Sequence, residues 1–366
     1  TESLAESSYS QTRESETMTD QYIDTPTDVR EGEELDVESL EAWLESEAPD
    51  IAGDVEVQQF PSGHSNLTYM VRIDGEEFVL RRPPFGAENI ATGHDMSREW
   101  TILSKLKGTF DQVPDTIVHC ENADVIGAPF YIMERVQGVI LRGANPSVPG
   151  LDEETMSELS DAFVETLVDV HDIDLEEVGL DDFGKPEGYV QRQVDGWIDR
   201  YEKSQTDDIP ALEEVADWLR DEMPEERGPS LIHNDYKYDN LVLAPDDLSE
   251  IRAILDWEMA TVGDPLMDLG TTLAYWVEPG DPDVLKSLNF GPTTLPGNFS
   301  RQELVDRYAE LSGRDVSDAL FYFVYGLYKV AVIGQQIYYR YKEGYTDDER
   351  FAMLIFAVKA LGETAS

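Results

Sequence analysis

The sequence is poor in basic residues and almost without cysteine. Lys and Arg account for 27 of the 366 residues and Asp and Glu for 77, which gives a net charge of −50. Nucleic acid needs a basic surface that neutralises its phosphates, and an anionic membrane surface attracts basic segments. The charge therefore argues against both kinds of partner. Cys120 is the single cysteine, so an internal disulfide and a cysteine zinc site are also excluded.

Long hydrophobic runs and histidine clusters are missing as well. The longest apolar stretch, 319–334, contains Lys329 and is shorter than a membrane-spanning helix requires. The five histidines lie far apart, without the spacing of metal ligands. Residues 1–34 contain no apolar run, so we expect no secretory leader within them. Together these absences predict a cytoplasmic protein.

The acidic residues are spread along the whole chain and are not confined to one end. Repulsion between so many like charges destabilises a compact state in dilute buffer. At molar salt the Debye length falls to about 3 Å, and this repulsion is screened. We therefore expect a halophilic protein from a salt-rich cytoplasm. Because acid is everywhere, acidic clusters in this chain do not indicate sites for cationic substrates.

The hydropathy pattern divides the chain into a tail and two lobes. Residues 1–34 are rich in acids, Ser and Thr, which predicts a disordered acidic tail. Residues 35–136 combine a leading helix, capped by Asp36, with a second helix and short alternating strands, two of which are joined by the hairpin dipeptide Asp74-Gly75. In residues 137–366, apolar side chains recur mainly at helical spacing, which predicts a mostly helical lobe. The predicted fold class is α+β, with a small antiparallel-sheet lobe and a larger helical lobe.

The positions of these elements follow from the same pattern. Strands are expected at 55–60, 67–73, 77–81, 116–121 and 129–135, and a helix at 96–106. Helices of the second lobe are expected at 151–171, 190–201, 211–222, 301–311, 316–342 and 347–361.

A polar loop between two apolar segments carries the most informative motif. His233, Asp235 and Asn240 have the spacing H-x-D-x4-N, and Asp256 ends another short strand. A carboxylate such as Asp235 can accept the proton of an attacking hydroxyl. The amide oxygen of Asn240 and the carboxylate of Asp256 are hard ligands of the kind that Mg²⁺ prefers. The spacing indicates phosphoryl transfer.

With the stretch LDWEMATVGDPLMDL at 255–269, this motif resembles the aminoglycoside phosphotransferase / choline kinase superfamily, which shares the protein-kinase fold. The closest resemblance is to the kinase-like domains associated with acyl-CoA dehydrogenases, and it extends from Val37 to Leu361. It implies a bilobal protein-kinase-like fold that uses ATP and Mg²⁺. It also implies that 35–136 is the nucleotide-binding lobe and 137–366 the catalytic and acceptor-binding lobe.

The resemblance assigns roles to residues of the polar loop. It implies that Asp235 is the catalytic base and that Asn240 and Asp256 are the magnesium ligands. Lys237 lies two residues after the base, where many kinases use a lysine to neutralise the transferring phosphate. His233 matches a histidine that supports the loop backbone, and Asp268 an aspartate that buttresses it.

The resemblance also assigns nucleotide contacts. Residues 60–69 match the phosphate-covering loop, although they lack G-x-G-x-x-G. Arg81 occupies the place of the usual strand lysine, and Glu99 that of its helix partner. An arginine there can fork onto phosphate oxygens. The proposed cofactor contacts are Gly63, which allows close backbone approach, the donors Ser65 and Asn66, the pair Arg81–Glu99, and the hinge residues Met133, Glu134 and Val136.

These observations favour an ATP- and Mg²⁺-dependent phosphotransferase acting on a hydroxyl group of a small molecule. The alternative is an inactive nucleotide-binding pseudokinase that acts through protein interaction. The sequence leaves open the identity of the acceptor, the preference for ATP or GTP, and whether the protein is a monomer or a homodimer. Candidates to line the acceptor pocket are Trp257, Tyr275, Trp276 and part of the aromatic stripe 321–328, with Arg192 and Gln193 weaker.

The charge generates a prediction about salt. We expect the chain to lose its fold as KCl is lowered from molar concentration to about 0.1 M, where the Debye length is roughly 10 Å. Far-ultraviolet circular dichroism and light scattering across this range measure the change. A chain that stays folded and monomeric at 0.1 M contradicts the halophilic interpretation.

Overall fold

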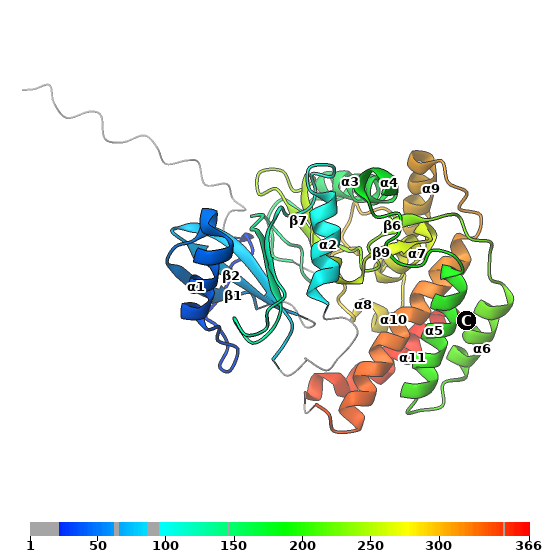
Figure 1. Ribbon diagram of the computed structural model, residues 1–366. Coiled ribbons are helices and arrows are strands. Elements are labelled where there is room, and N and C mark those ends of the chain that lie inside the picture. Colours follow the sequence, from blue (N-terminus) through cyan, green and yellow to red (C-terminus); the bar gives the residue numbers. More distant parts are fainter. Residues whose placement is uncertain (1–21, 62–65, 86–94, 145, 347) are drawn as a thin grey trace, which may run out of the picture.

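The computed structural model describes residues 22–61, 66–85, 95–144, 146–346 and 348–366. They form two lobes: a twisted antiparallel sheet with two helices, and a larger, mainly helical lobe (Figure 1). This is the bilobal α+β architecture expected from the sequence. In the described residues, no helix is long and apolar enough to cross a membrane.

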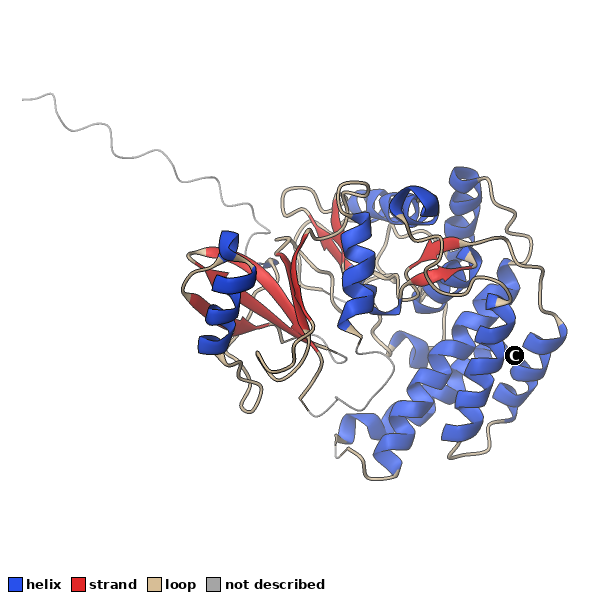
Figure 2. Cartoon of the chain, viewed as in Figure 1, coloured by secondary structure: helices blue, strands red, loops and turns tan. Residues whose placement is uncertain are grey.

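The N-terminal lobe is built on a five-stranded sheet in the order β1-β2-β3-β5-β4. Helix α1 covers its outer face (Figure 2). Asp36 caps α1 as predicted, accepting a hydrogen bond from the N–H of Ser39. The elements of this lobe are α1 (Val37–Glu47), the short 3₁₀ helix η2 (Pro49–Ile51), β1 (Val55–Gln59), β2 (Leu67–Ile73), β3 (Glu76–Arg82), α2 (Met96–Leu106), β4 (Thr116–Cys120) and β5 (Phe130–Glu134).

The alternation of strand side chains fixes which residues of β3 reach the other lobe. Successive side chains of a strand point to opposite faces of its sheet. Leu80 packs with α1 on the outer face, whereas Val79 belongs to the core on the inner face. Arg81, which pairs with Thr68 and Tyr131 across the sheet, therefore points inward with Val79.

The C-terminal lobe places two small hairpin-like strand pairs, β6-β9 and β7-β8, on a group of helices. Its elements are α3 (Glu153–His171), α4 (Leu175–Val178), α5 (Tyr189–Ser204), α6 (Pro210–Asp221), β6 (Ser230–Ile232), η3 (Tyr238–Asn240), β7 (Leu241–Leu243), β8 (Ile251–Ile254), η4 (Trp257–Met259), β9 (Thr261–Gly263), α7 (Pro265–Tyr275), α8 (Asp283–Lys286), α9 (Arg301–Ser312), α10 (Ala319–Lys342), η5 (Glu349–Met353) and α11 (Leu354–Ala365). The helix expected at 347–361 is thus η5 followed by α11.

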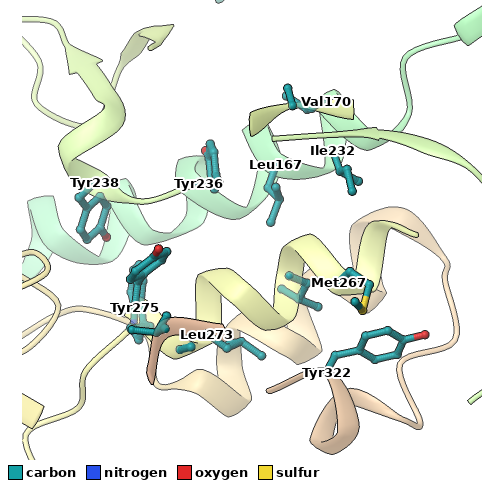
Figure 3. Packing of buried hydrophobic residues seen from close by; sticks show 14 of the residues in the cluster. Leu167, Val170, Ile232, Tyr236, Tyr238, Met267, Leu273, Tyr275 and Tyr322 are labelled. Atoms are coloured by element: carbon teal, nitrogen blue, oxygen red, sulfur yellow. The ribbon is translucent and has the colours of Figure 1, made fainter. Parts of the chain in front are cut away.

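A buried layer between α3 and α7 supports the polar loop that follows β6. Leu167 of α3, Tyr236 of the loop and Met267 and Leu273 of α7 belong to one apolar cluster (Figure 3). The hydroxyl of Tyr236 donates to the carbonyl of Phe163 at 2.9 Å. The loop therefore rests on packed helices and is not a free surface segment.

The disordered tail predicted for residues 1–34 extends too far along the chain, because residues 22–34 have defined contacts. Residues 22–34 follow a defined path beside both lobes: Thr27 pairs with Gln59, and Ile23 with Val139. The carboxylate of Asp24 accepts hydrogen bonds from Arg142 at 2.6 and 3.2 Å. Backbone pairing and ion pairs hold this polar segment without a large apolar surface. Residues 1–21 lie outside the described part.

The packing of α7 on α10 generates a prediction. Gly270 of α7 and Gly326 of α10 face each other so closely that a Cβ on Gly270 overlaps the carbonyl of Tyr322. Gly270→Ala forces the helices apart, and such overpacking costs typically about 1–3 kcal/mol of unfolding free energy. Chemical denaturation measures this change. Gly280→Ala is the matched control, because a Cβ there meets nothing within 4 Å; equal stability of the two variants contradicts the prediction.

Candidate active site

A cavity of about 720 Å³ lies between the lobes. Its size is typical of small-molecule sites. It brings together most of the residues that the sequence singled out, from elements far apart in the chain. These are Arg81, Glu99, Met133, Glu134, Val136, Asp235, Lys237, Asn240 and Asp256.

Asp235 is held by two neighbours from its own loop. The amide nitrogen of Asn240 donates to the carboxylate of Asp235 at 3.0 Å and to its backbone carbonyl at 2.9 Å. The ammonium of Lys237 lies 3.0 Å from the same carboxylate oxygen. The amide nitrogen of Asn240 is thus engaged, whereas its amide oxygen has no hydrogen-bond partner among the described residues and stays available as a ligand.

A buried carboxylate fixes the backbone before Asp235. The two oxygens of Asp268, on α7, accept the backbone N–H groups of His233 at 2.6 Å and Asn234 at 2.7 Å. His171 contacts Asp268 at 3.2 Å. Burial alone raises the pKa of Asp268, but these hydrogen bonds and nearby histidines outweigh it and lower the pKa. Asn234 adopts a left-handed conformation, with φ of 67°, which asparagine tolerates better than most residues.

His233 has a structural place in this loop. Burial lowers its pKa, so the ring is neutral near pH 7. Its Nε2 contacts the carbonyl of Leu255 at 3.0 Å, and its Nδ1 accepts the N–H of Asp235 at 3.3 Å. These two contacts tie the loop to the segment that carries Asp256.

Arg81 connects the sheet lobe to this segment. Its guanidinium forms an ion pair with Glu99 of α2 and another, at 2.9 Å, with Asp256. Glu99 also accepts the backbone N–H of Trp257 at 3.1 Å. Burial raises the pKa of Glu99, and the charge of Arg81 acts against it. In Asp256 the effect of Arg81 outweighs burial and lowers the pKa, so this carboxylate is ionised.

The expected phosphate-covering loop is described only in part. Gly63 and Ser65 lie outside the described residues. Asn66 is buried, and its amide donates to Glu258 at 2.7 Å. Glu258, in turn, lies 3.7 Å from Arg81. Asn66 therefore links the sheet lobe to the LDWE segment, and this contact is different from the phosphate contact that the sequence suggested.

The hinge residues line the cavity. Apolar side chains from both lobes line it as well, among them Val79 and Met133 from the sheet lobe and Val242 and Ile254 from the helical lobe. Among the described residues, the backbone N–H of Val136 has no hydrogen-bond partner. Apolar walls together with a free backbone donor suit a heterocyclic base.

The structure adds groups that sequence analysis missed. Tyr275, expected only as an acceptor-pocket wall, lines the cavity beside the loop: the ammonium of Lys237 lies 4.9 Å from the centre of its ring, and burial, the largest cause, raises its pKa well above the ordinary range. Asp239 lines the cavity, and burial raises its pKa to about 6. Asp24 reaches the cavity from the segment assigned to the tail. Glu258 was visible in the LDWE motif, whereas Tyr275, Asp239 and Asp24 carried no spacing signal.

The oxygen donors fit a magnesium ion that is completed by phosphates. Magnesium sites of this type use one or two carboxylates together with substrate phosphates. In the described residues, no cluster of three or more His, Cys, Asp or Glu side chains could hold a metal alone. The pairing of β7 with β8 sets Asn240 beside Leu255, whose N–H donates to the Asn240 carbonyl at 2.8 Å. Asn240 and Asp256 are thus neighbours that could share one ion.

Two lobes, an Arg–Glu pair and an Asp-centred loop on one cavity define the protein-kinase-like fold of small-molecule phosphotransferases. A Ralstonia eutropha protein, provisionally described as an aminoglycoside phosphotransferase, has a similar structure, with a TM-score of 0.77 at 30% identity over 91% of this chain and 97% of the other. A thermostable mutant of the aminoglycoside phosphotransferase APH(4)-Ia shares the fold, with a TM-score of 0.57 at 17% identity over 90% of this chain and 99% of the other.

The chain belongs to the phosphotransferase enzyme family (APH), whose model matches residues 56–303. It is 33% identical to acyl-CoA dehydrogenase family member 11 of Rattus norvegicus over 344 residues, which are 90% of this chain and 43% of that protein. It is 34% identical to family member 10 of Mus musculus over 290 residues, 79% of this chain and 27% of that protein. The chain thus spans less than half the length of these relatives.

The Asp268 network generates a prediction for stability. In Asp268→Asn, an amide nitrogen replaces one of the two carboxylate oxygens that accept the buried N–H groups of His233 and Asn234. One of these donors then loses its partner, which should lower the unfolding free energy by about 3 kcal/mol near pH 7. Because the pKa of Asp268 is lowered in the folded state, its contribution is present above the ordinary value of about 3.9 and is lost as the pH falls below it. The difference between wild type and variant should therefore shrink in acid.

Denaturant titrations at several pH values measure this difference. Asp283→Asn is the matched control, because the Asp283 side chain is 97% exposed, and it should change stability by less than about 0.5 kcal/mol. A difference between wild type and Asp268→Asn that does not vary with pH would show that the charge of Asp268 does not hold the loop.

Proposed function

We propose that this protein is an ATP- and Mg²⁺-dependent phosphotransferase that phosphorylates a hydroxyl group of a small molecule. Residues 35–136 would bind the nucleotide, and residues 137–366 would carry the catalytic loop and the acceptor. The observation that carries the proposal is the convergence of Asp235, Asn240 and Asp256, with Arg81, on the cavity between the lobes. The APH family membership supports the same chemistry.

Asp235 is the proposed proton acceptor for the acceptor hydroxyl. Its carboxylate lies on the cavity, and Lys237 and Asn240 orient it. Phosphoryl transfer depends mainly on positioning and electrostatic stabilisation, with a carboxylate that accepts the hydroxyl proton. A base held by two neighbours of its own loop meets the positioning requirement without large movement.

Arg81 and Lys237 supply the positive charge near the transferred group. Arg81 is buried and always protonated, and its planar fork matches two phosphate oxygens. Burial tends to lower the pKa of Lys237, but the surrounding carboxylates outweigh it and raise the pKa, so the ammonium stays charged. Asn240 and Asp256 would hold the metal ion, which when bound neutralises charge on the phosphates.

ATP as the donor is supported by the fold neighbours and by the hinge. Structures of APH(4)-Ia contain AMP-PNP with hygromycin B in one case and ADP with hygromycin B in another. In this chain, the apolar side chains near the hinge and the free N–H of Val136 offer a base two kinds of contact, stacking and a hydrogen bond.

The proposal is tested with Asp235→Ala. Wild-type protein is incubated in high salt with ATP, MgCl₂ and a panel of small alcohols, and the phosphorylated product is measured by ³¹P NMR. Loss of the general base should lower the transfer rate about 10²–10⁴-fold. Binding of a fluorescent ATP analogue should persist, because Asp235 does not contact the hinge.

Asp217→Asn, an exposed substitution on α6, is the control for charge and handling and should keep wild-type activity. Omission of MgCl₂ should abolish transfer. Nucleotide binding without transfer to any alcohol would contradict the enzyme proposal and would favour the pseudokinase alternative.

A further inference from the structure

A second cavity of about 310 Å³ lies next to the first and is lined by basic side chains. Five of the chain's 27 Lys and Arg residues line it: Arg98, Lys185, Arg192, Arg200 and Lys329. They come from α2, the segment before α5, α5 itself and α10. Among the described residues, no Asp or Glu lines this cavity. We call it the basic pocket.

The cations of the basic pocket form no direct ion pair within the described residues, although Asp95 acts on Arg98, and Asp235 and Asp268 act on Lys329, from a longer distance. Within the described part of the chain, none of the five side chains lies within 4.0 Å of a carboxylate oxygen. The nearby acids of α5 are engaged elsewhere, Asp195 with Arg220 at 3.5 Å and Asp199 with Lys203 at 2.5 Å. Lys329 is buried, whereas Lys185, Arg192 and Arg200 are exposed and within reach of a ligand that enters from solvent. In a chain with 77 acidic residues, five cations on one cavity without an ion pair form a local positive site for an anionic ligand.

Contacts with carbonyls and aromatic rings orient the guanidinium groups. Arg98 donates to the carbonyl of Ala260 at 3.0 Å, and its guanidinium carbon lies 4.4 Å from the centre of the Phe183 ring. Arg192 donates to the carbonyls of Glu187 and Lys185. Arg200 lies over the Trp197 ring, 4.7 Å from its centre. These neutral contacts orient the side chains without forming an ion pair.

Lys329 connects the basic pocket to the catalytic loop. It is 2% exposed, and its ammonium donates to the carbonyl of Asn234 at 2.8 Å. Burial lowers its pKa to about 8. Asn234 precedes the proposed base Asp235 and also lines the basic pocket. Met259 lines both cavities, so a ligand could extend from one to the other.

We propose that the basic pocket binds an oxyanion group, phosphate or carboxylate, of the acceptor. The acceptor would then be an anionic alcohol, whose charged group lies among these cations while its hydroxyl reaches Asp235. Arginine forks bind such groups through paired hydrogen bonds. The part of this inference that concerns the hydroxyl rests on the proposed phosphotransferase function. The binding of an anion in the basic pocket does not depend on it.

Binding is tested with simple anions at constant ionic strength. Inorganic phosphate and acetate are titrated calorimetrically into protein saturated with AMP-PNP and Mg²⁺, so that the nucleotide cavity is filled. The double variant Arg192→Gln/Arg200→Gln should weaken the binding of phosphate, acetate or both at least tenfold. Lys329 is not substituted, because its removal disturbs the loop. The control, Arg340→Gln/Lys359→Gln, makes the same change in charge outside the basic pocket and should bind as wild type does.

Acceptor choice is tested with matched pairs: glycerol against glycerol 3-phosphate, and propane-1,2-diol against lactate. With ATP and Mg²⁺, we expect the anionic member of at least one pair to have a kcat/KM at least tenfold higher. Arg192→Gln/Arg200→Gln should remove this preference mainly through a higher KM. A preference for glycerol 3-phosphate over glycerol identifies a phosphate as the bound group, and a preference for lactate over propane-1,2-diol identifies a carboxylate.

The outcomes separate the two proposals. Equal anion binding by wild type and Arg192→Gln/Arg200→Gln, or none by wild type, overturns the basic pocket as an anion site. Transfer to neutral alcohols without a preference that depends on the pocket overturns the anionic acceptor and leaves the phosphotransferase intact. Pocket-dependent anion binding without transfer to any alcohol supports the anion site while the phosphotransferase proposal fails.

Discussion

The contact on which the site depends most is that between the Asp268 carboxylate and two successive backbone N–H groups, those of His233 and Asn234. A buried carboxylate is stable only when its oxygens are well hydrogen-bonded. Asp268 meets this condition by fixing the backbone that enters the loop. The left-handed turn at Asn234 then directs Asp235 into the cavity between the lobes and turns the Asn234 carbonyl toward Lys329. One buried charge thus positions the loop for both cavities.

Arg81 has a comparable role between the lobes. Its partners Glu99 and Asp256 belong to α2 and to the segment after β8, so a single guanidinium links three parts of the cavity. Such a buried group is stable only while it is paired. Because the same fork suits phosphate oxygens, a nucleotide could share Arg81 with Asp256 without leaving any charge unpaired.

The sequence predicted well those parts that depend on local pattern or on a motif. The family resemblance singled out Arg81, and the H-x-D-x4-N spacing singled out Asp235 and Asn240; all three residues line the cavity between the lobes. The ordered conformation of residues 22–34 was not predicted from the sequence. A polar segment that is held by backbone pairing and ion pairs has the same composition as a disordered segment. The contact of Asn66 with Glu258 was not predicted either, since the two residues lie 192 positions apart in the sequence.

The basic pocket could not be predicted for a related reason. Its cations come from four separate segments, and no spacing in the sequence joins Arg98 of α2 to Arg200 of α5 or to Lys329 of α10. In a chain with a net charge of −50, however, the few basic residues carry more information than the many acidic ones. Most of them form ion pairs with carboxylates that are abundant everywhere. A group of cations that has avoided such pairing, in a cavity next to the catalytic loop, is therefore better explained by a ligand's charge than by the needs of the fold.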